Sequence, residues 1–487
     1  MRPATERLIS FISLGLPWVI SAVIGAWLFF AIPVEPLLHT DEIRTAERSR
    51  GFLLNGDFWI VREGEEPIFA KPPLQYWLTA PLIAWLGPCE YAVRLWSVIF
   101  AAGGIAAAAW LAKILWPGHQ FVMPLASFLV ALNSAFLTHG LSGLLDAGQA
   151  LGFTLLAISV AKTASSQRWW IMSGIVAGLL ALQKSPAGLL FLVGFMLVIA
   201  LERRSLNAVF TPWAIAGLCV AAIPAILWPA IQVANFGSFA YDVMFGQQIV
   251  NRFTYGTQGV VQDGIMEYVL GFFTSWKLCS ALVVVAVGSA VVISPQGAHP
   301  MLRCLSILVL LYGIVAALPK PTYGRYILAI VPISAAIASG ILLSLALRHK
   351  LFGFLLIFSL VTSLPFEGVN CERSHFNSIY YASQARIAKH LRSMMPPSSK
   401  LIIADGQFAI EPRIFAYYMN LPNIPITTSI ADLRLDANAA IAQESTELFI
   451  VCNIQQSRIL RRIYRRAKLI LTDGDFELLR ISWRESQ

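Results

Sequence analysis

Two charged motifs near the first apolar segment hold the residues of this chain best suited to chemistry. The first is Thr40-Asp41-Glu42-Ile43-Arg44, and about thirty residues later comes Lys71-Pro72-Pro73-Leu74. Only 13% of the residues are charged, so such clusters need a physical reason. An ionisable group at membrane depth is costly and commonly serves a function. The two motifs are therefore our first candidates for a reaction or binding site.

Asp41 carries a carboxylate that suits several tasks. It can act as a general base on a hydroxyl group, or bind a metal ion or a cationic substrate group. The competing interpretation is an acid in the first turn of a helix, where it complements the helix dipole. Glu42 points about 100° away from Asp41 on a helix. The two acids need not act together, and a structural role is favoured for Glu42, which stays a secondary candidate.

Lys71 is held in place by the prolines after it, because a residue before proline is kept extended. A lysine fixed near the lipid headgroups is a natural partner for a phosphate. The alternative is a lysine whose stem lies on apolar surface while its ammonium reaches water. The motif alone leaves both interpretations open.

Asp146 interrupts the apolar stretch 141–160 and needs a partner in space, because no cation lies nearby in the sequence. We expect it at the outer end of a membrane span, on the same side as Asp41. Several bases are also expected on that side, where the usual bias of membrane proteins does not favour them: Lys184, Arg252, Lys320 and Arg325. They suit a lipid phosphate, and the alternative is that they are solvated loop cations.

The composition indicates a membrane protein. Hydrophobic residues make up 57% of the 487 residues, and the mean hydropathy is +0.67, whereas soluble domains average about 45–50% apolar residues. The net charge of +9 does not indicate nucleic-acid binding, because many bases lie in short loops rather than on one basic face. The N-terminal stretch is expected to be a retained signal anchor.

The apolar runs and the loop charges predict the topology. With the N-terminus in the cytoplasm, basic residues mark every inside segment, and the chain after the last span lies outside. We predict eleven spans, at 10–32, 91–115, 120–138, 143–162, 169–183, 186–201, 210–232, 267–294, 302–318, 327–346 and 351–366. The first outer loop, 33–90, is expected to hold helices over 41–54 and 74–86 beside the membrane.

The composition changes after about residue 371, where apolar runs shorten and charge rises. Strands are predicted over 401–404, 447–451, 468–471 and 476–481, and helices over 377–394 and 455–466. The predicted fold is an all-α polytopic membrane bundle over 1–370, followed by a small extracytoplasmic α/β domain over 371–487.

Cysteine and histidine spacings predict no metal centre. Cys371 and Cys452 both fall in the predicted outer domain, where the oxidising surroundings allow a disulfide. No Gly-rich loop of the nucleotide-binding types is present in the sequence. No cofactor is predicted with certainty, and the sequence leaves open a divalent metal ion at the acids.

A set of motifs in a fixed order resembles a known family. The motifs are Asp41-Glu42, Asn55-Gly56-Asp57-Phe58-Trp59, Lys71-Pro72-Pro73-Leu74-Gln75-Tyr76-Trp77, Leu86-Gly87 and Ala92-Val93-Arg94-Leu95. They resemble the lipid-linked glycosyltransferases of the GT-C fold, in particular the bacterial aminoarabinose transferases within the protein mannosyltransferase superfamily. The resemblance covers residues 33–201 well and extends loosely to about residue 365.

The resemblance implies an integral enzyme of the bacterial inner membrane, with its site on the periplasmic face. Such an enzyme moves a sugar from a polyprenyl phosphate to a hydroxyl or phosphate acceptor and inverts the anomeric carbon. By resemblance, Asp41 is the catalytic acid, Asp146 is a second acid of the site, and Lys71 holds the lipid phosphate. Arg252 resembles a phosphate-binding arginine, and Tyr326 a tyrosine at the donor phosphate.

Departures from the family pattern leave the sugar and the acceptor open. Ala70 stands where the family often has an acid, Thr45 stands where it often has tyrosine, and the tail is shorter. The acceptor can be lipid A, another glycan or a protein. Two other functions stay open: a flippase for lipid-linked sugars, which would show inverted repeats and paired broken helices, and a non-catalytic envelope assembly subunit, which would be expected to lack the acid and the lysine.

Overall fold

The computed structural model describes most of the chain. The described residues are 2–37, 40–184, 187–205, 209–254, 269–270, 273, 278–293, 295, 297–319, 323–363, 375–396, 399–404, 410–421, 426–427, 447–464 and 466–482.

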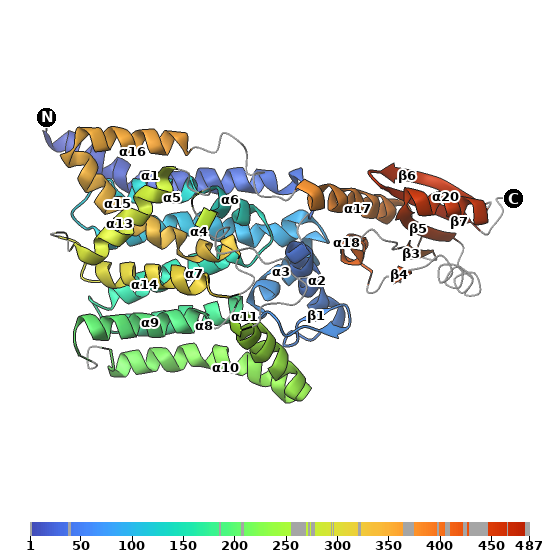
Figure 1. Ribbon diagram of the computed structural model, residues 1–487, viewed down its shortest axis with the longest axis horizontal. Coiled ribbons are helices and arrows are strands. Elements are labelled where there is room, and N and C mark those ends of the chain that lie inside the picture. Colours follow the sequence, from blue (N-terminus) through green and yellow to red (C-terminus); the bar gives the residue numbers. More distant parts are fainter. Residues whose placement is uncertain are drawn as a thin grey trace.

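Apolar helices lying side by side make up the first three quarters of the chain (Figure 1). A helix satisfies its own backbone hydrogen bonds, which a lipid environment requires. The bundle helices are α1 (Arg2–Ala31), α4 (Glu90–Leu115), α5 (Val122–Ala131), α6 (Ser134–Leu141), α7 (Asp146–Lys162), α8 (Trp169–Gln183), α9 (Ala187–Glu202), α10 (Pro212–Tyr241), α13 (Leu278–Val292), α14 (Leu302–Ala316), η4 (Gly324–Ile330), α15 (Val331–Arg348) and α16 (Lys350–Thr362).

Some of these helices are long and apolar enough to cross a membrane unaided. Among the described residues there are four such segments: Ile12–Val34, Glu90–Leu115, Pro212–Phe253 and Gly324–Arg348. Helices α5 and α6 form a fifth if their bent pair counts as one span. Helices α8, α9, α13, α14 and α16 are apolar but shorter. A multi-pass membrane protein follows, while the number of eleven spans stays a prediction.

The predicted span 120–138 is not one straight helix. It divides into α5 and α6, which meet at 68°. Asn133 makes the break, because its side chain accepts a hydrogen bond from the backbone N–H of Phe136 and so caps the start of α6. Part of the predicted span 267–294 lies outside the described residues, and the described helix there, α13, begins at Leu278.

Helices α8 and α10 approach each other closely through glycines. A Cβ atom on Gly174 would lie 2.1 Å from the carbonyl oxygen of Gly217, and one on Gly217 would lie 2.3 Å from that of Trp170. Small residues at such crossings let backbones touch, which is how helices associate in lipid. This contact fixes the position of α8, which ends immediately before Lys184.

The first outer loop contains the two expected helices and a hairpin that was not predicted. Helices α2 (Thr40–Asn55) and α3 (Leu74–Leu86) confirm the predictions over 41–54 and 74–86. Between them, β1 (Arg62–Glu63) and β2 (Glu66–Pro67) pair antiparallel. A short 3₁₀ helix, η1 (Ile32–Val34), joins α1 to this loop.

Helix α10 continues into a π-helical turn beside the membrane bundle. Gly237, at φ 62°, breaks the helix direction. The chain then forms η3 (Asp242–Val250) and the short α11 (Asn251–Thr254). After this bend, Arg252 of α11 lies within hydrogen-bond distance of Tyr326 in η4.

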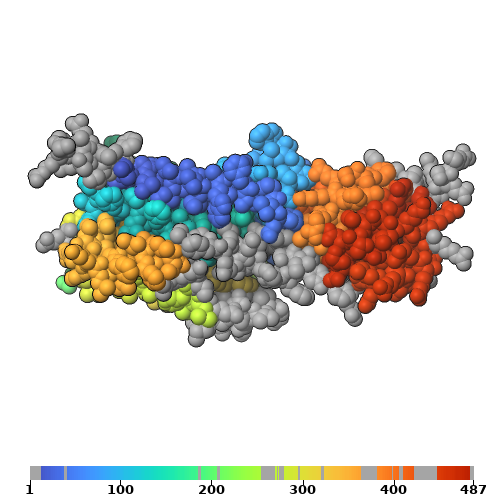
Figure 2. Space-filling view, turned by 90° about the horizontal axis from the view of Figure 1, so that it is seen from above, coloured from blue at the N-terminus to red at the C-terminus, as the bar shows by residue number. Residues whose placement is uncertain are grey.

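The C-terminal part is a five-stranded sheet with helices, at the opposite end of the elongated molecule from the N-terminus (Figures 1 and 2). The strand order is β4-β3-β5-β7-β6, with β3 parallel to β4 and β5 and the other pairs antiparallel. The elements are α17 (His375–Met394), β3 (Lys400–Ala404), α18 (Pro412–Met419), β4 (Ile426–Thr427), β5 (Glu447–Asn453), α20 (Ile454–Ile463), β6 (Ala467–Asp473) and β7 (Phe476–Ser482).

This part confirms the predicted strands and helices of the tail and adds α18 and β4. The division at residue 370 stays a prediction, because residues 364–374 lie outside the described residues. The same holds for the proposed disulfide, since Cys371 lies in that gap. Cys452 is a buried free thiol in β5, and its Sγ lies 3.7 Å from the carbonyl oxygen of Glu477, to which it donates.

Candidate functional site

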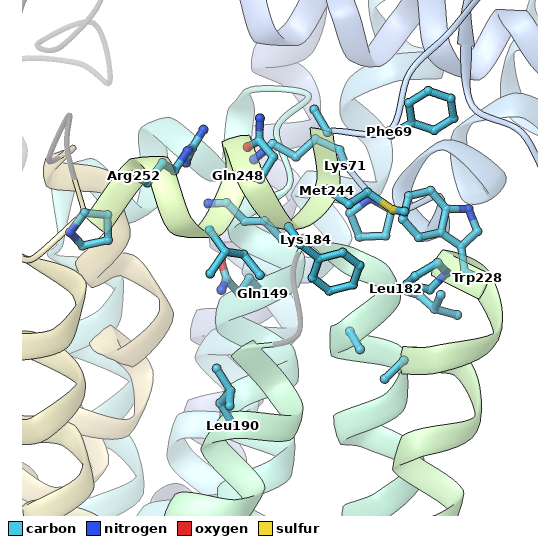
Figure 3. A pocket seen from close by; sticks show the side chains of 18 of the residues that line it. Phe69, Lys71, Gln149, Leu182, Lys184, Leu190, Trp228, Met244, Gln248 and Arg252 are labelled. Atoms are coloured by element: carbon cyan, nitrogen blue, oxygen red, sulfur yellow. The ribbon is translucent and has the colours of Figure 1, made fainter. Parts of the chain in front are cut away.

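One cavity of about 350 Å³ brings together residues that are far apart in the sequence (Figure 3). Lys71, Lys184, Arg252 and Tyr326 all line it. Its other walls are largely apolar and include Phe69, Leu182, Leu190, Pro224, Trp228 and Met244. Figure 3 shows the cationic side chains gathered toward one end and Leu190 at the other. Such a cavity suits an anionic group attached to an apolar chain.

Lys71 reaches this cavity from the segment just before α3. Loss of water contact, together with the positive charges of Lys184, Arg252 and Arg325, lowers the pKa of Lys71 to about 7. An anion bound beside this ammonium would offset both effects. The group is therefore held in a state that a phosphate would stabilise.

Arg252 and Tyr326 meet on the far side of the cavity. The Nη1 of Arg252 donates to the phenol oxygen of Tyr326 across 3.2 Å. The hydroxyl of Tyr312 donates to the backbone carbonyl of Tyr326 across 3.3 Å, which holds η4 in place. The ammonium of Lys184 lies 5.4 Å from the centre of the Tyr326 ring. The elements that carry these groups, η3–α11, η4 and the end of α8, therefore converge on one point.

Asp41 stands beside the cavity rather than in its described lining. One carboxylate oxygen lies 3.0 Å from Nη2 of Arg325, and the other accepts from Nη1 of Arg44 across 3.2 Å. Arg325 is the residue before Tyr326, so this ion pair joins the start of α2 to the cavity wall. The Asp41 side chain is 33% exposed, which leaves it accessible to a second substrate.

Asp146 has the partner in space that its position in an apolar stretch requires. The ammonium of Lys184 donates to its carboxylate, and Nδ1 of His139 lies 3.5 Å from the other oxygen. Asp146 begins α7, and Gln149, one turn later, lines the cavity. His139 stands seven residues before Asp146 in the sequence.

Glu42 lies outside this arrangement and joins elements of the fold. It receives Nε and Nη2 of Arg94 across 2.6 and 3.0 Å, and the backbone N–H of Gly143 across 2.9 Å. The favoured structural role of Glu42 agrees with this geometry. Lys320, the remaining candidate, lies outside the described residues.

The sequence left open a divalent metal ion at the acids of this site. Across the described segments, no group of three or more His, Cys, Asp or Glu side chains could hold one. Asp41 and Asp146 each already form an ion pair with a basic side chain, Arg325 and Lys184 respectively. The metal ion that the sequence left open gains no support from these residues.

Fold and cavity together define a multi-pass membrane protein with a cationic pocket at one end of its helices. This is the GT-C fold of membrane transferases, as solved structures show. The crystal structure of ArnT from Cupriavidus metallidurans bound to undecaprenyl phosphate superposes with a TM-score of 0.73 at 14% identity, covering 96% of this chain and 97% of that one. An archaeal oligosaccharyltransferase, AglB from Archaeoglobus fulgidus in complex with an inhibitory peptide and a dolichol-phosphate, gives 0.52 at 12% identity, covering 92% and 70%.

Sequence comparison leads to the same group. The chain is 25% identical over 237 residues to an undecaprenyl phosphate-alpha-4-amino-4-deoxy-L-arabinose arabinosyl transferase of Yersinia pestis, and equally to that of Yersinia pseudotuberculosis. The match covers 46% of this chain and 42% of each relative, so the chain aligns with less than half the length of these relatives. No protein-family profile matches the chain. The predicted resemblance to aminoarabinose transferases is thereby confirmed.

Proposed function

We propose that the protein is an inverting glycosyltransferase that moves a sugar from a polyprenyl phosphate to an acceptor on the periplasmic face of the bacterial inner membrane. One observation carries the proposal. Lys71, Arg252 and Tyr326, the three residues matched to a donor-phosphate site, line one cavity with apolar walls. The relatives named above act on an undecaprenyl phosphate sugar, which supports a donor of that class.

The cationic end of the cavity would stabilise the leaving group. As the bond between the anomeric carbon and the phosphate oxygen breaks, its electron pair passes to the phosphate. Lys71 and Arg252 would balance that charge, and the Tyr326 hydroxyl would donate a hydrogen bond. Donors fixed in advance at the site of growing charge give the largest catalytic effects in many enzymes.

Asp41 would serve the acceptor. An acceptor hydroxyl gives its proton to the Asp41 carboxylate while its oxygen forms the new bond from the face opposite the phosphate, which inverts the anomeric carbon. The ion pair with Arg325 keeps the carboxylate oriented. With a phosphate acceptor that is already ionised, Asp41 would only position it. Asp146, held by Lys184, would place that ammonium at the cavity.

The charges at the helix ends support a periplasmic site. Lys113, Lys162, Arg203, Arg303 and Arg348 stand at or next to helix ends on one side of the bundle. Three of these helices, α7, α9 and α14, reach the cavity at their other ends through Gln149, Leu190 and Val315. Because basic residues favour the cytoplasmic side, the cavity and the C-terminal part would face the periplasm.

A reconstituted assay tests this proposal. Purified protein in proteoliposomes is given a polyprenyl-phosphate sugar with lipid A, a core glycan or a peptide, and free polyprenyl phosphate is measured. Release that depends on the acceptor supports the transferase, and the acceptor that permits release identifies the substrate. An intact donor with every acceptor would overturn it, and an intact donor that changes leaflet would indicate a flippase instead.

A further inference from the structure

The junction between the C-terminal part and the chain that enters α2 supports a further inference, which rests on the function proposed for Asp41. At its centre is Tyr418 of α18, whose side chain is 1% exposed. Its hydroxyl accepts the backbone N–H of Leu37 across 3.0 Å and donates to Oε1 of Glu90 across 2.7 Å. Leu37 stands four residues before Asp41.

Lys389 of α17 also contacts both Glu90 and Tyr418 at this junction. Nζ of Lys389 lies 2.5 Å from Oε1 of Glu90 and 4.9 Å from the centre of the Tyr418 ring. Burial, and next the Glu90 carboxylate, raise the pKa of Tyr418 far above its usual value. The phenol therefore stays protonated over the whole working range and holds its two partners at every such pH.

Two further contacts fasten the body of α2 to the C-terminal part. Nη1 of Arg50 donates to the carbonyl of Leu421 across 2.8 Å, while its other nitrogens bind Glu47. In the second contact, Nη1 of Arg413 in α18 lies 3.1 Å from Oε2 of Glu63 in β1.

Glu63 links Arg413 to both outer-loop helices, α2 and α3. Its Oε1 receives Nε of Arg48 of α2 across 2.7 Å, and Nη1 of Arg48 donates to the hydroxyl of Tyr76 of α3 across 3.0 Å. Helix α2 thus stands between two supports, with Arg325 of the bundle at its first turn and the C-terminal part along its length.

We propose that Tyr418 is a positioning residue for Asp41. It holds the backbone at Leu37, three residues before α2 begins, and would thereby set the position and direction in which the helix presents the Asp41 carboxylate. Neither Lys71 nor Arg252 depends on this contact, because they stand on other segments. A displacement of about 1 Å at a reacting group can cost about 10²-fold in rate, so the contact would act on turnover rather than on donor binding.

The test uses the full-length protein in lipid nanodiscs. Tyr418→Phe keeps the ring and removes the hydroxyl. We expect kcat to fall about tenfold to a hundredfold, with the KM for the donor within about twofold of the wild-type value. The matched control is Arg386→Ala, which removes the ion pair from Arg386 of α17 to Asp473 of β6 and should leave kcat unchanged. A raised KM with an unchanged kcat would overturn the inference.

A double-mutant cycle with Asp41→Asn shows whether the effect passes through Asp41. If it does, Asp41→Asn/Tyr418→Phe retains the same activity as Asp41→Asn alone, whereas independent defects multiply. Multiplied defects, or wild-type kcat in Tyr418→Phe, overturn the positioning role and leave the proposed function standing. Wild-type activity in Asp41→Asn overturns the role of Asp41 itself. Should Tyr418→Phe fail to fold, Leu37→Pro, which removes the N–H that donates to the Tyr418 hydroxyl, takes its place in the same cycle.

Discussion

Two charged clusters next to α2 differ in how their charge is balanced. Around Glu42, Arg94 makes hydrogen bonds to the carboxylate and to three backbone carbonyls, those of Ile32, Glu35 and Pro36. In the cavity, Lys71, Lys184 and Arg252 stand together, and Asp146, which stands outside the described lining, is paired with Lys184 alone of the three. The charges of the Glu42 cluster are balanced within the protein, whereas the cluster in the cavity carries surplus positive charge.

The difference separates structure from function. A buried charge that is fully paired holds elements together, and removing one partner is costly because the other remains unpaired. Like charges gathered in a cavity repel one another, and a fold gains nothing from them without an anion. Glu42 and Asp41 are adjacent in the sequence, yet they belong to these two different settings. The comparison can be tested from both sides.

The largest expected effect is that of Asp41→Asn. Loss of a general base lowers turnover by about 10²–10⁴-fold, while Lys71 and Arg252 keep donor affinity near the wild-type value. Single-turnover rates with a hydroxyl acceptor measure the loss of turnover. Equilibrium binding of the lipid phosphate measures the donor affinity. Glu65→Gln, an exposed acid of the same outer loop, is the control and should turn over normally. Wild-type turnover in Asp41→Asn would remove it from the reaction.

On the structural side, Glu42→Ala should unfold the protein more easily. Arg94 would keep its carbonyl partners but lose its counter-charge, and such losses cost about 3–5 kcal/mol. Chemical denaturation in detergent measures the free energy of unfolding. The lipid-phosphate affinity of the folded fraction should stay unchanged. A stable variant with weakened donor binding would instead place Glu42 in the site and erase the contrast.

Much of the fold could be predicted from the sequence, because its signals are local. Runs of apolar residues mark the bundle helices. Of the outer helices, α2 follows from the acids of its first turn and α3 from an apolar run rich in aromatic residues. The break at Asn133 was missed because its cap is a single polar residue in an apolar run. Helix α18 has a usable signal, since Glu411 caps it and Pro412 follows as its first residue. The β1–β2 hairpin has only two residues in each strand, too few for a pattern.

The site could be predicted only in part, because its contacts are not local. Lys71, Arg252 and Tyr326 were proposed as one site from a resemblance, whereas no spacing rule connects them. Asp146 was expected to have a partner, but Lys184 is 38 residues away. Arg94 was recognised as part of a motif, and its pairing with Glu42 across 52 residues was not. Pairing over such separations depends on the tertiary fold.

Lys71→Ala should weaken donor binding, with a smaller effect than those expected of Asp41→Asn and Glu42→Ala. A hydrogen bond to a charged group contributes about 1.5–3 kcal/mol, which corresponds to about a tenfold to 150-fold loss of affinity. Lys162→Ala serves as the control, since that ammonium lies over Trp110 and Trp169 near the other end of the bundle. Titration of nanodisc-embedded protein with a polyprenyl phosphate reports both affinities. Equal affinities in the two variants would argue against a phosphate at Lys71.

The smallest expected effect is the pH dependence of that binding. The pKa of Lys71 is lowered to about 7 in the free protein, so the side chain loses its charge as pH rises through 7. A bound phosphate favours the charged form, and affinity should therefore fall by up to about tenfold per pH unit above 7. A prenyl phosphodiester is the suitable probe, because its own charge is constant between pH 6 and 9. The Lys71→Ala variant should show a flat profile over this range. If wild type and Lys71→Ala share one slope, the titrating group is another one, and the surplus charge of the cavity would then rest on Arg252.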